Sequence, residues 1–333
     1  MKKHSTYRMM AGGVLAAALG SASLAAVAQS AVMYTSNNPA TVETALGALK
    51  KGTPGINVSQ VSGGTGVLMK RIQAEAQNPQ SDIIWGAGFS TLAIYKDYFE
   101  PYASPQAASI PADMRDAGNR WAASNVHVMV VMSNAKRLKD LPVPAKWADL
   151  FDPRYKGLIA MGDPSKSGST YFQVYGLYRM FGADGLEKLA KNAVVLASSG
   201  QVYKGVGSGE YPLSITMEYS AYEYVAGGQK EIKLTYPAEG TFLQPEGMAL
   251  VKGARNGAAA KTLYDGLLSK AVQEAVLKEN FRRPSRTDIQ VSKLTELPEL
   301  SSIKVFALDQ AEAARDYDKV IAVWNEALAK AKQ

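Results

Sequence analysis

Two short stretches combine glycine with serine and threonine where a predicted strand gives way to a predicted helix. Residues 62–66 read SGGTG, and residues 165–170 read SKSGST. A helix N-terminus carries free backbone N–H groups and the positive end of the helix dipole, and glycine lets a ligand approach that backbone closely. Hydroxyl side chains add further donors. Both stretches are therefore suited to binding a phosphate, phosphonate, sulfate or carboxylate group.

Ordinary helix capping is the competing interpretation, because a single Ser or Thr side chain is enough to cap a helix. Neither stretch ends in the Gly-Lys-Ser/Thr of a P-loop, and neither has GxGxxG spacing. Two such stretches at comparable strand-to-helix points nevertheless favour contact with a ligand. The residues that we expect to form an anion site are Ser62, Gly64, Thr65, Ser167, Gly168, Ser169 and Thr170.

Other polar or glycine-rich stretches follow further predicted strands: TSNN (35–38), WGAG (85–88) and the start of EYSAYEY (218–224). Ligands of open α/β sheets bind at the carboxyl ends of strands. A carboxylate at position 218 could meet an amine or a sugar hydroxyl, and a phenol at position 219 could donate to an oxyanion or bind a metal. The residues that we expect to contact the rest of the ligand are Ser36, Asn37, Trp85, Gly86, Glu218 and Tyr219.

A basic run, RRPSR (282–286), could form an anion clamp. Runs of this kind are more often charged connectors on the surface, and we predict that role for it.

The elements that would position these residues alternate between apolar runs and helical patterns, which indicates an α/β architecture. Residues 31–98 repeat strand and helix in the order of a parallel-sheet lobe. The run NVHVMVVMSN (125–134) is too apolar for an edge strand and predicts a buried one that leaves this lobe. Residues 146–164 predict a helix, a turn and a strand, residues 256–280 a pair of helices, and residues 317–333 a closing amphipathic helix.

The first 28 residues have the composition of a secretory signal peptide, with a basic start, an apolar stretch and AVA before Gln29. We expect cleavage after Ala28 and export to the periplasm. Cleavage would remove three of the 37 basic residues and none of the 30 acidic ones, which leaves a net charge of about +4. That mild excess suits an anionic ligand, and no basic run with interleaved aromatic residues predicts nucleic-acid binding.

The chain has no cysteine, which excludes a lipid-modified cysteine anchor, a thiol nucleophile and disulfides. Beyond the signal peptide its single histidine is His127. Because this histidine lies within the apolar run 125–134, we expect it in a buried strand rather than in a catalytic triad.

Residues 146–171, KWADLFDPRYKGLIAMGDPSKSGSTY, resemble a segment of the periplasmic substrate-binding proteins of ABC importers, with the pattern Trp-x-Asp-Leu … Pro-x-Tyr-x-Gly … Asp-Pro-x-x-Ser-Gly-Thr. The stretches 62–88, 235–256 and WNEAL (324–328) fit the same family. The branch that the chain resembles groups ferric-iron, thiamine, 2-aminoethylphosphonate and sugar-phosphate binders.

The resemblance implies a type II periplasmic binding fold, which has two α/β lobes joined by hinge strands and a ligand in the cleft between them. We expect lobe 1 to comprise residues 29–125 and 246–290, and lobe 2 to comprise residues 126–245 and 291–333. The hinge crossovers would lie near residues 124–132 and 240–248.

The hydroxyl-rich helix starts resemble those of the phosphate-binding members. The resemblance therefore implies a monomeric binding protein without a cofactor or a catalytic role. It would capture a phosphonate, such as 2-aminoethylphosphonate, or a sugar phosphate and deliver it to an inner-membrane permease. Ferric-binding members use an adjacent tyrosine pair, but here Ser220 follows Tyr219.

Three alternatives remain open from the sequence. The first is a ferric-iron-binding protein of the same fold, and the second is a binder of polyamines or carboxylates. The third is an exported serine hydrolase with Ser167 or Ser169 as its nucleophile, although no G-x-S-x-G elbow surrounds either serine.

Overall fold

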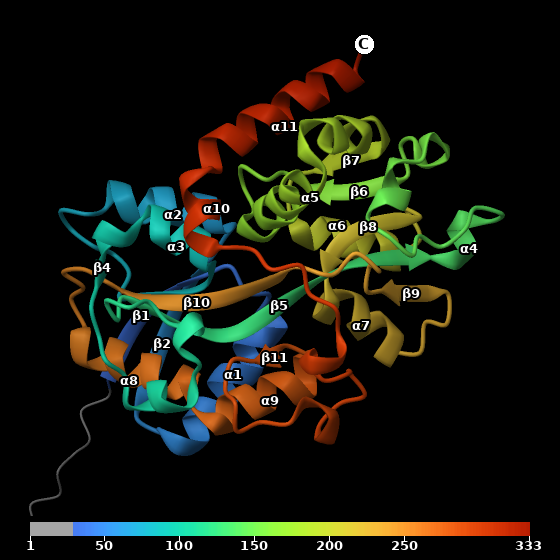
Figure 1. The fold of residues 1–333 in the computed structure, drawn as a ribbon. Coiled ribbons are helices and arrows are strands. Elements are labelled where there is room, and N and C mark those ends of the chain that lie inside the picture. The colour runs from blue at the N-terminus through green and yellow to red at the C-terminus, as the bar shows by residue number, and fades with distance from the viewer. Residues whose placement is uncertain (1–28) are drawn as a thin grey trace, which may run out of the picture.

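The computed structural model describes residues 29–333, so the predicted signal peptide lies outside the described residues. Strands form one hydrogen-bonded path in the order β2-β1-β3-β10-β5-β8-β6-β7. Figure 1 shows the path divided between two α/β lobes, with β5 and β10 running from one lobe toward the other. The predicted fold class, a two-lobed type II periplasmic binding fold, is confirmed.

The first lobe is a parallel sheet covered by helices on both faces. Successive side chains of a strand face opposite sides of a sheet. Met33 accordingly packs with residues of α1, α8 and α9, whereas Tyr34 packs with residues of α2 and α3. The elements of this lobe are β1 (Gln29–Thr35), α1 (Pro39–Gly52), β2 (Ile56–Ser62), α2 (Thr65–Ala74), β3 (Ile83–Gly88), α3 (Phe89–Ile94), α8 (Gly257–Leu268) and α9 (Lys270–Asn280).

One long strand, β5 (Trp121–Asn134), connects the lobes and is buried at every position. Its first part pairs with β10 (Leu243–Val251), and its last part pairs with β8 (Leu213–Met217). This confirms the prediction of a buried strand over 125–134. The short strands β4 (Phe99–Glu100), β9 (Ile232–Thr235) and β11 (Arg283–Pro284) add to the edges of β10 and β5.

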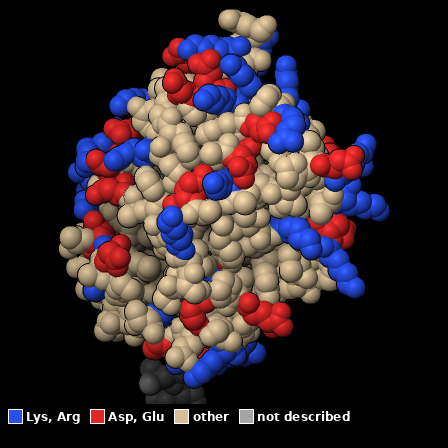
Figure 2. Space-filling model, turned by 45° about the vertical axis from the view of Figure 1, so that its right-hand side comes forward, with Lys and Arg blue, Asp and Glu red and all other residues tan. Residues whose placement is uncertain are grey.

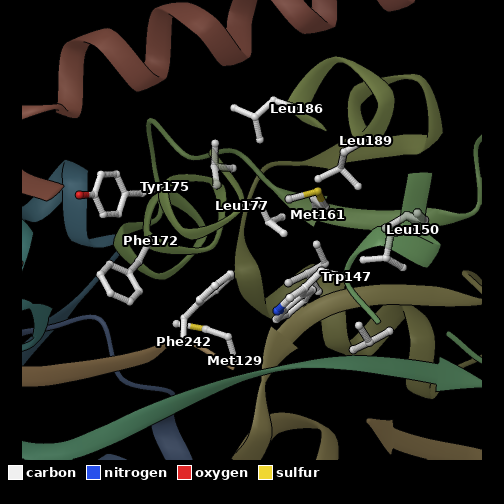
Figure 3. Close-up of a cluster of buried hydrophobic side chains, with 14 of the residues drawn as sticks. Met129, Trp147, Leu150, Met161, Phe172, Tyr175, Leu177, Leu186, Leu189 and Phe242 are labelled. Atoms are coloured by element: carbon white, nitrogen blue, oxygen red, sulfur yellow. The ribbon is translucent and has the colours of Figure 1, made fainter. Parts of the chain in front are cut away.

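The second lobe has its own apolar core, in which the rings of Trp147 and Phe242 stack at 5.1 Å (Figure 3). The helical segment α5, which is broken at Gly182 where the backbone has φ +68°, lies against this core, and α11 packs along it (Figure 1). The helix α10 (Gln310–Arg315) lies against α3 of the first lobe. The elements of the second lobe are α4 (Ala135–Leu138), β6 (Ile159–Gly162), α5 (Gly168–Asn192), β7 (Ala193–Leu196), α6 (Ser199–Gly207), β8, α7 (Glu218–Ala226), β9 and α11 (Tyr317–Ala331).

The helix predicted after residue 146 is instead a pair of short 3₁₀ turns, Ala148–Phe151 and Pro153–Tyr155. The carboxylate of Asp149 accepts hydrogen bonds from the backbone N–H groups of residues 145 and 146, which holds the chain in a turn. Pro153 then lacks the N–H group that a continuing helix would need.

The lobes touch through the two glycine-containing stretches singled out in the sequence. A Cβ atom on Gly64 would lie 3.0 Å from the carbonyl oxygen of Lys166, and one on Gly66 would lie 3.0 Å from that of Ser165. Such distances are too short for an ordinary carbon–oxygen contact. Glycine at these two positions therefore allows the backbone of the second lobe to rest directly on the start of α2.

Within residues 29–333, no helix combines the length and the apolar character that crossing a membrane requires. On the face drawn in Figure 2, basic and acidic side chains are interspersed rather than gathered by sign. That face therefore has none of the extended basic surface that nucleic-acid binding requires.

Replacing Gly66 by alanine should strain the contact between the lobes, because the new methyl group meets the Ser165 carbonyl oxygen of the other lobe at 3.0 Å and a shift of a few tenths of an ångström must relieve it. Urea denaturation should show a lower free energy of unfolding for Gly66→Ala than for the wild type. Gly47→Ala is the matched control: Gly47 lies within α1 with no atom near its Cβ position, so this change should stabilise the protein by about 0.5–1 kcal/mol. Equal stabilisation by the two substitutions would contradict the steric account.

Candidate functional site

A cavity of about 190 Å³ lies between the lobes, where strand ends from the first lobe meet helix starts from both. Hydroxyl groups and glycine backbone make up much of its wall. The residues that line it are Ser36, Gly64, Thr65, Val67, Gly86, Gly88, His127, Lys166, Ser167, Ser169, Ala197, Ser198, Ser199, Met217, Tyr219, Gln244 and Glu246.

Five helices begin at this cavity: α3 and α7, which follow Gly88 and Met217, and also α2, α5 and α6. The last three follow Gly64, Ser167 and Ser198, which supply glycine backbone and hydroxyl groups to the wall. The hydroxyl of Ser167 accepts a hydrogen bond from the Thr170 N–H at 3.3 Å, so it does cap α5. Capping uses only one of the free N–H groups of a helix start, and the positive ends of these three helices face the same small volume. The wall therefore favours an anion.

Two strand ends of the first lobe meet on the opposite side of the cavity. Gly86 has φ +105°, and the Ser36 hydroxyl donates a hydrogen bond to its carbonyl oxygen. A Cβ atom on Gly86 would lie 2.8 Å from the Ser36 oxygen and 2.9 Å from the amide nitrogen of Asn37. Glycine is therefore required here, both for the left-handed backbone and for the close approach of the 35–38 stretch.

Seven of the thirteen residues predicted from the sequence line the cavity. These are Ser36, Gly64, Thr65, Gly86, Ser167, Ser169 and Tyr219. The glycine-rich stretches, which lie far apart in the sequence, are thus brought together across the cleft.

The other six predicted residues lie outside the lining. Ser62 is exposed at the end of β2, and the indole N–H of Trp85 donates to the Ser124 hydroxyl at 2.9 Å. Thr170 is buried under Gly162, while the carbonyl oxygen of Gly168 accepts from the Gln244 amide at 3.3 Å. The remaining two are Asn37, which is buried with no hydrogen-bond partner for its side-chain amide among the described residues, and Glu218.

Glu218 faces an arginine instead of the cavity. Its carboxylate receives two hydrogen bonds from Arg283, at 2.6 and 2.8 Å, and a third from the Tyr236 hydroxyl. Both members of the ion pair are 1% exposed. The carboxylate has its partners inside the protein, which corrects the expectation that it would meet a ligand amine or hydroxyl.

The prediction that residues 282–286 form an exposed connector was wrong. Arg282, Arg283 and Arg286 are all buried, and each has a carboxylate partner. A buried guanidinium requires such partners because its desolvation is costly. The buried arginines of this run link β5, β10 and α7 inside the protein.

Four side chains form a hydrogen-bonded cluster beside the cavity, which we call the floor: His127, Tyr219, Glu246 and Arg282. His127 Nε2 lies 2.8 Å from one oxygen of the Glu246 carboxylate. Arg282 donates to the other oxygen at 3.1 Å and to the Tyr219 hydroxyl at 3.0 Å, with its guanidinium 4.0 Å from the centre of the Tyr219 ring. Three of the four line the cavity, with Arg282 behind them.

The surroundings of the floor shift the pKa values of two of its members, Glu246 and Tyr219. Burial alone would raise the pKa of Glu246, but the charges of His127 and Arg282, with hydrogen bonds from His127 and Asn125, lower it to about 2. Burial raises the pKa of Tyr219 to about 12, although Arg282 acts in the opposite direction. Glu246 is therefore an anion and Tyr219 a neutral phenol throughout the physiological range.

The floor was largely missed from the sequence. One signal was available: His127 is a polar residue inside an apolar strand, and a buried imidazole needs a partner. Nothing in the local pattern identified that partner, since Glu246 comes from β10 and Arg282 from the chain after α9.

Residues 78–314 match the model of a family described as bacterial extracellular solute-binding protein. A putative 2-aminoethylphosphonate-binding periplasmic protein of Salmonella typhimurium is 28% identical over 261 residues, which cover 72% of each chain. An uncharacterized protein of Haemophilus influenzae is 28% identical over 238 residues, covering 67% of this chain and 68% of its own.

Two solved structures share the fold. The periplasmic binding protein AfuA of Actinobacillus pleuropneumoniae, with fructose-6-phosphate bound, has a TM-score of 0.83 and 24% identity, covering 90% of this chain and 98% of its own. Iron-bound HitA of Pseudomonas aeruginosa has a TM-score of 0.79 and 19% identity, covering 90% and 99%. The fold is thus shared by proteins whose ligands differ in kind.

Removing Arg283 should destabilise the protein strongly, because it leaves the buried Glu218 carboxylate without its ion-pair partner. We expect Arg283→Met to lower the free energy of unfolding by about 3–5 kcal/mol in urea denaturation. Arg154→Met, which breaks the exposed pair with Asp152, should have a much smaller effect. Equal losses in the two variants would contradict the assigned role of the buried pair.

The pKa of Glu246 predicts a loss of stability in acid. Its folded-state pKa of about 2 lies below the ordinary value of 4.5, so the unfolded chain takes up a proton more readily. The stabilisation by this carboxylate is present above pH 4.5 and is lost as the pH falls toward 2. Urea denaturation of Glu246→Gln between pH 7 and pH 2 should show a shallower decline than the wild type. Glu43→Gln, an exposed control, should follow the wild type, and parallel curves for all three proteins would refute the assignment.

Proposed function

The chain belongs to the bacterial extracellular solute-binding proteins, and from that premise we propose that it captures a small anionic organophosphorus solute between its lobes. The solute is a phosphonate or a sugar phosphate, which a monomeric protein delivers to the inner-membrane permease of an ABC importer. In this proposal the step takes place in the periplasm, after export through the predicted signal peptide. The likeness to a Salmonella typhimurium protein named for 2-aminoethylphosphonate supports the ligand class.

The observation that carries the proposal is the convergence of three helix N-termini on one small cavity lined with hydroxyl groups. The oxygens of a phosphate or phosphonate accept several hydrogen bonds at once, and backbone N–H and Ser/Thr hydroxyl groups are donors suited to them. Thr65 on α2 and Ser167 before α5 face the ligand from opposite lobes. Binding thus favours the closed arrangement, because only that arrangement offers both sets of donors.

The alternative of ferric iron fits this cavity poorly. Iron of that charge binds anionic oxygen ligands. The pKa of Tyr219 is raised by burial, its oxygen already accepts a hydrogen bond from Arg282, and the neighbouring residue is Ser220. Among residues 29–333 no group of three or more His, Cys, Asp or Glu side chains is placed to hold a metal ion.

Thermal unfolding in the presence of candidate ligands tests the proposal. The ligands are 2-aminoethylphosphonate, glucose 6-phosphate, 3-phosphoglycerate, inorganic phosphate and ferric citrate. An organophosphorus ligand at a hundred times its dissociation constant should stabilise the fold by about 2.7 kcal/mol, which raises the melting temperature by a few degrees. A rise with ferric citrate alone would overturn the proposal.

Variants of the cavity wall locate the binding. Thr65→Ala and Ser167→Ala should each weaken the affinity about 10-fold or more in isothermal titration calorimetry, because each removes a donor to a charged group. Ser62→Ala is the matched control, since Ser62 belongs to the same SGGTG stretch but is exposed and outside the cavity. Affinities that are equal in all three variants would place the ligand elsewhere.

A further inference from the structure

The floor of the cavity bears on which organophosphorus ligands the protein accepts. Resting on the proposed function, we infer that the site selects ligands whose second polar group is a neutral hydroxyl and discriminates against ligands that carry an ammonium group there. This chemical class comprises hydroxyalkyl phosphonates and hydroxylated phosphate esters. The inference depends on what is available in the cavity to pair with a cation.

Glu246 is the only carboxylate among the lining residues of the cavity. Both of its oxygens are engaged: Oε2 with His127 at 2.8 Å, and Oε1 with Arg282 at 3.1 Å and with the side-chain amide of Asn125 at 2.8 Å. Arg282 is 2% exposed and Glu246 5% exposed in their side chains. If Glu246 turned to a ligand ammonium, a buried guanidinium would lose its counter-ion, and such a loss is costly.

The other charged groups near the cavity are cationic or are paired at its rim. The guanidinium of Arg282 lies behind Tyr219, and the Lys166 ammonium is paired with Asp163 at 2.9 Å. The positive ends of α2, α5 and α6 add to the same field. Among the described residues that line the cavity, a ligand ammonium would meet no free anion, and ammonium groups are desolvated on binding at a high cost.

A ligand hydroxyl, in contrast, finds both a donor and an acceptor. The Tyr219 oxygen accepts from Arg282, so its own proton is left to donate. The Gln244 amide nitrogen donates to the carbonyl oxygen of Gly168 at 3.3 Å, which leaves its amide oxygen as an acceptor on the cavity wall. A hydroxyl accepts the Tyr219 proton and donates to the Gln244 oxygen, whereas an ammonium has no lone pair and leaves the Tyr219 donor without a partner.

Matched ligand pairs test the inference by isothermal titration calorimetry at pH 7. One pair is 2-hydroxyethylphosphonate and 2-aminoethylphosphonate, and the other is glucose 6-phosphate and glucosamine 6-phosphate. Within each pair the two compounds differ only in a hydroxyl or an ammonium group. We expect the hydroxyl compound to bind at least about 10-fold more tightly in whichever pair binds.

The outcomes separate the inference from the function on which it rests. Equal or tighter binding of the amine would overturn the inference and leave the organophosphorus function standing. Absence of binding by all four compounds would count against both.

A substitution in the protein tests the same preference for a hydroxyl over an ammonium group. Gln244→Glu adds a carboxylate to the cavity wall, so the preference for the hydroxyl compound should shrink or reverse. Gln60→Glu, an exposed change on β2, should leave the preference as in the wild type. An unaltered preference in Gln244→Glu, with the ligand still bound, would contradict the electrostatic explanation.

Discussion

Two consecutive buried arginines, Arg282 and Arg283, hold together the parts of the protein on which the cavity depends. Arg282 pairs with Glu246 on β10 and reaches Tyr219 on α7, while Arg283 pairs with Glu218 at the start of α7. Because an unpaired guanidinium in the interior is strongly unfavourable, each arginine fixes the position of its partner. These ion pairs thereby hold the start of α7 against β5 and β10, the strands that connect the lobes.

These buried ion pairs determine the chemical character of the cavity. Glu246 is paired with the Arg282 guanidinium and its other oxygen is in contact with His127, so the floor presents no free carboxylate. The wall presents three helix N-termini and several hydroxyl groups. Negative charge is thus accommodated at the wall, and the glycines at 64 and 66 let the lobes come close enough for both sets of donors to act together. Relatives of the same fold carry names that refer to iron, phosphonate or sugar phosphate, so the side chains rather than the fold decide the ligand.

The sequence predicted the α/β architecture and the helix starts well, because the alternation of strands and helices and the glycine-serine stretches are local signals, while the two-lobed fold was implied by the family resemblance. It could not predict which side chains those strands aim at one another. Glu218 was correctly placed at a strand end, yet it faces Arg283 rather than the cavity, and Ser62 ends exposed. The floor brings His127 and Glu246 together from positions over a hundred residues apart, and no local pattern shows such a pairing. The basic run 282–286 looked like a surface segment because its acidic partners are distant in the sequence.

A crystal structure of the protein with a bound hydroxyalkyl phosphonate would test the central claim most directly. We predict that the phosphorus group lies between the starts of α2 and α5, within hydrogen-bond distance of Thr65 and Ser167. Glu246 should still be held by His127 and Arg282. A phosphorus group bound away from the helix starts, or a Glu246 carboxylate released from Arg282 to face the ligand, would contradict the account.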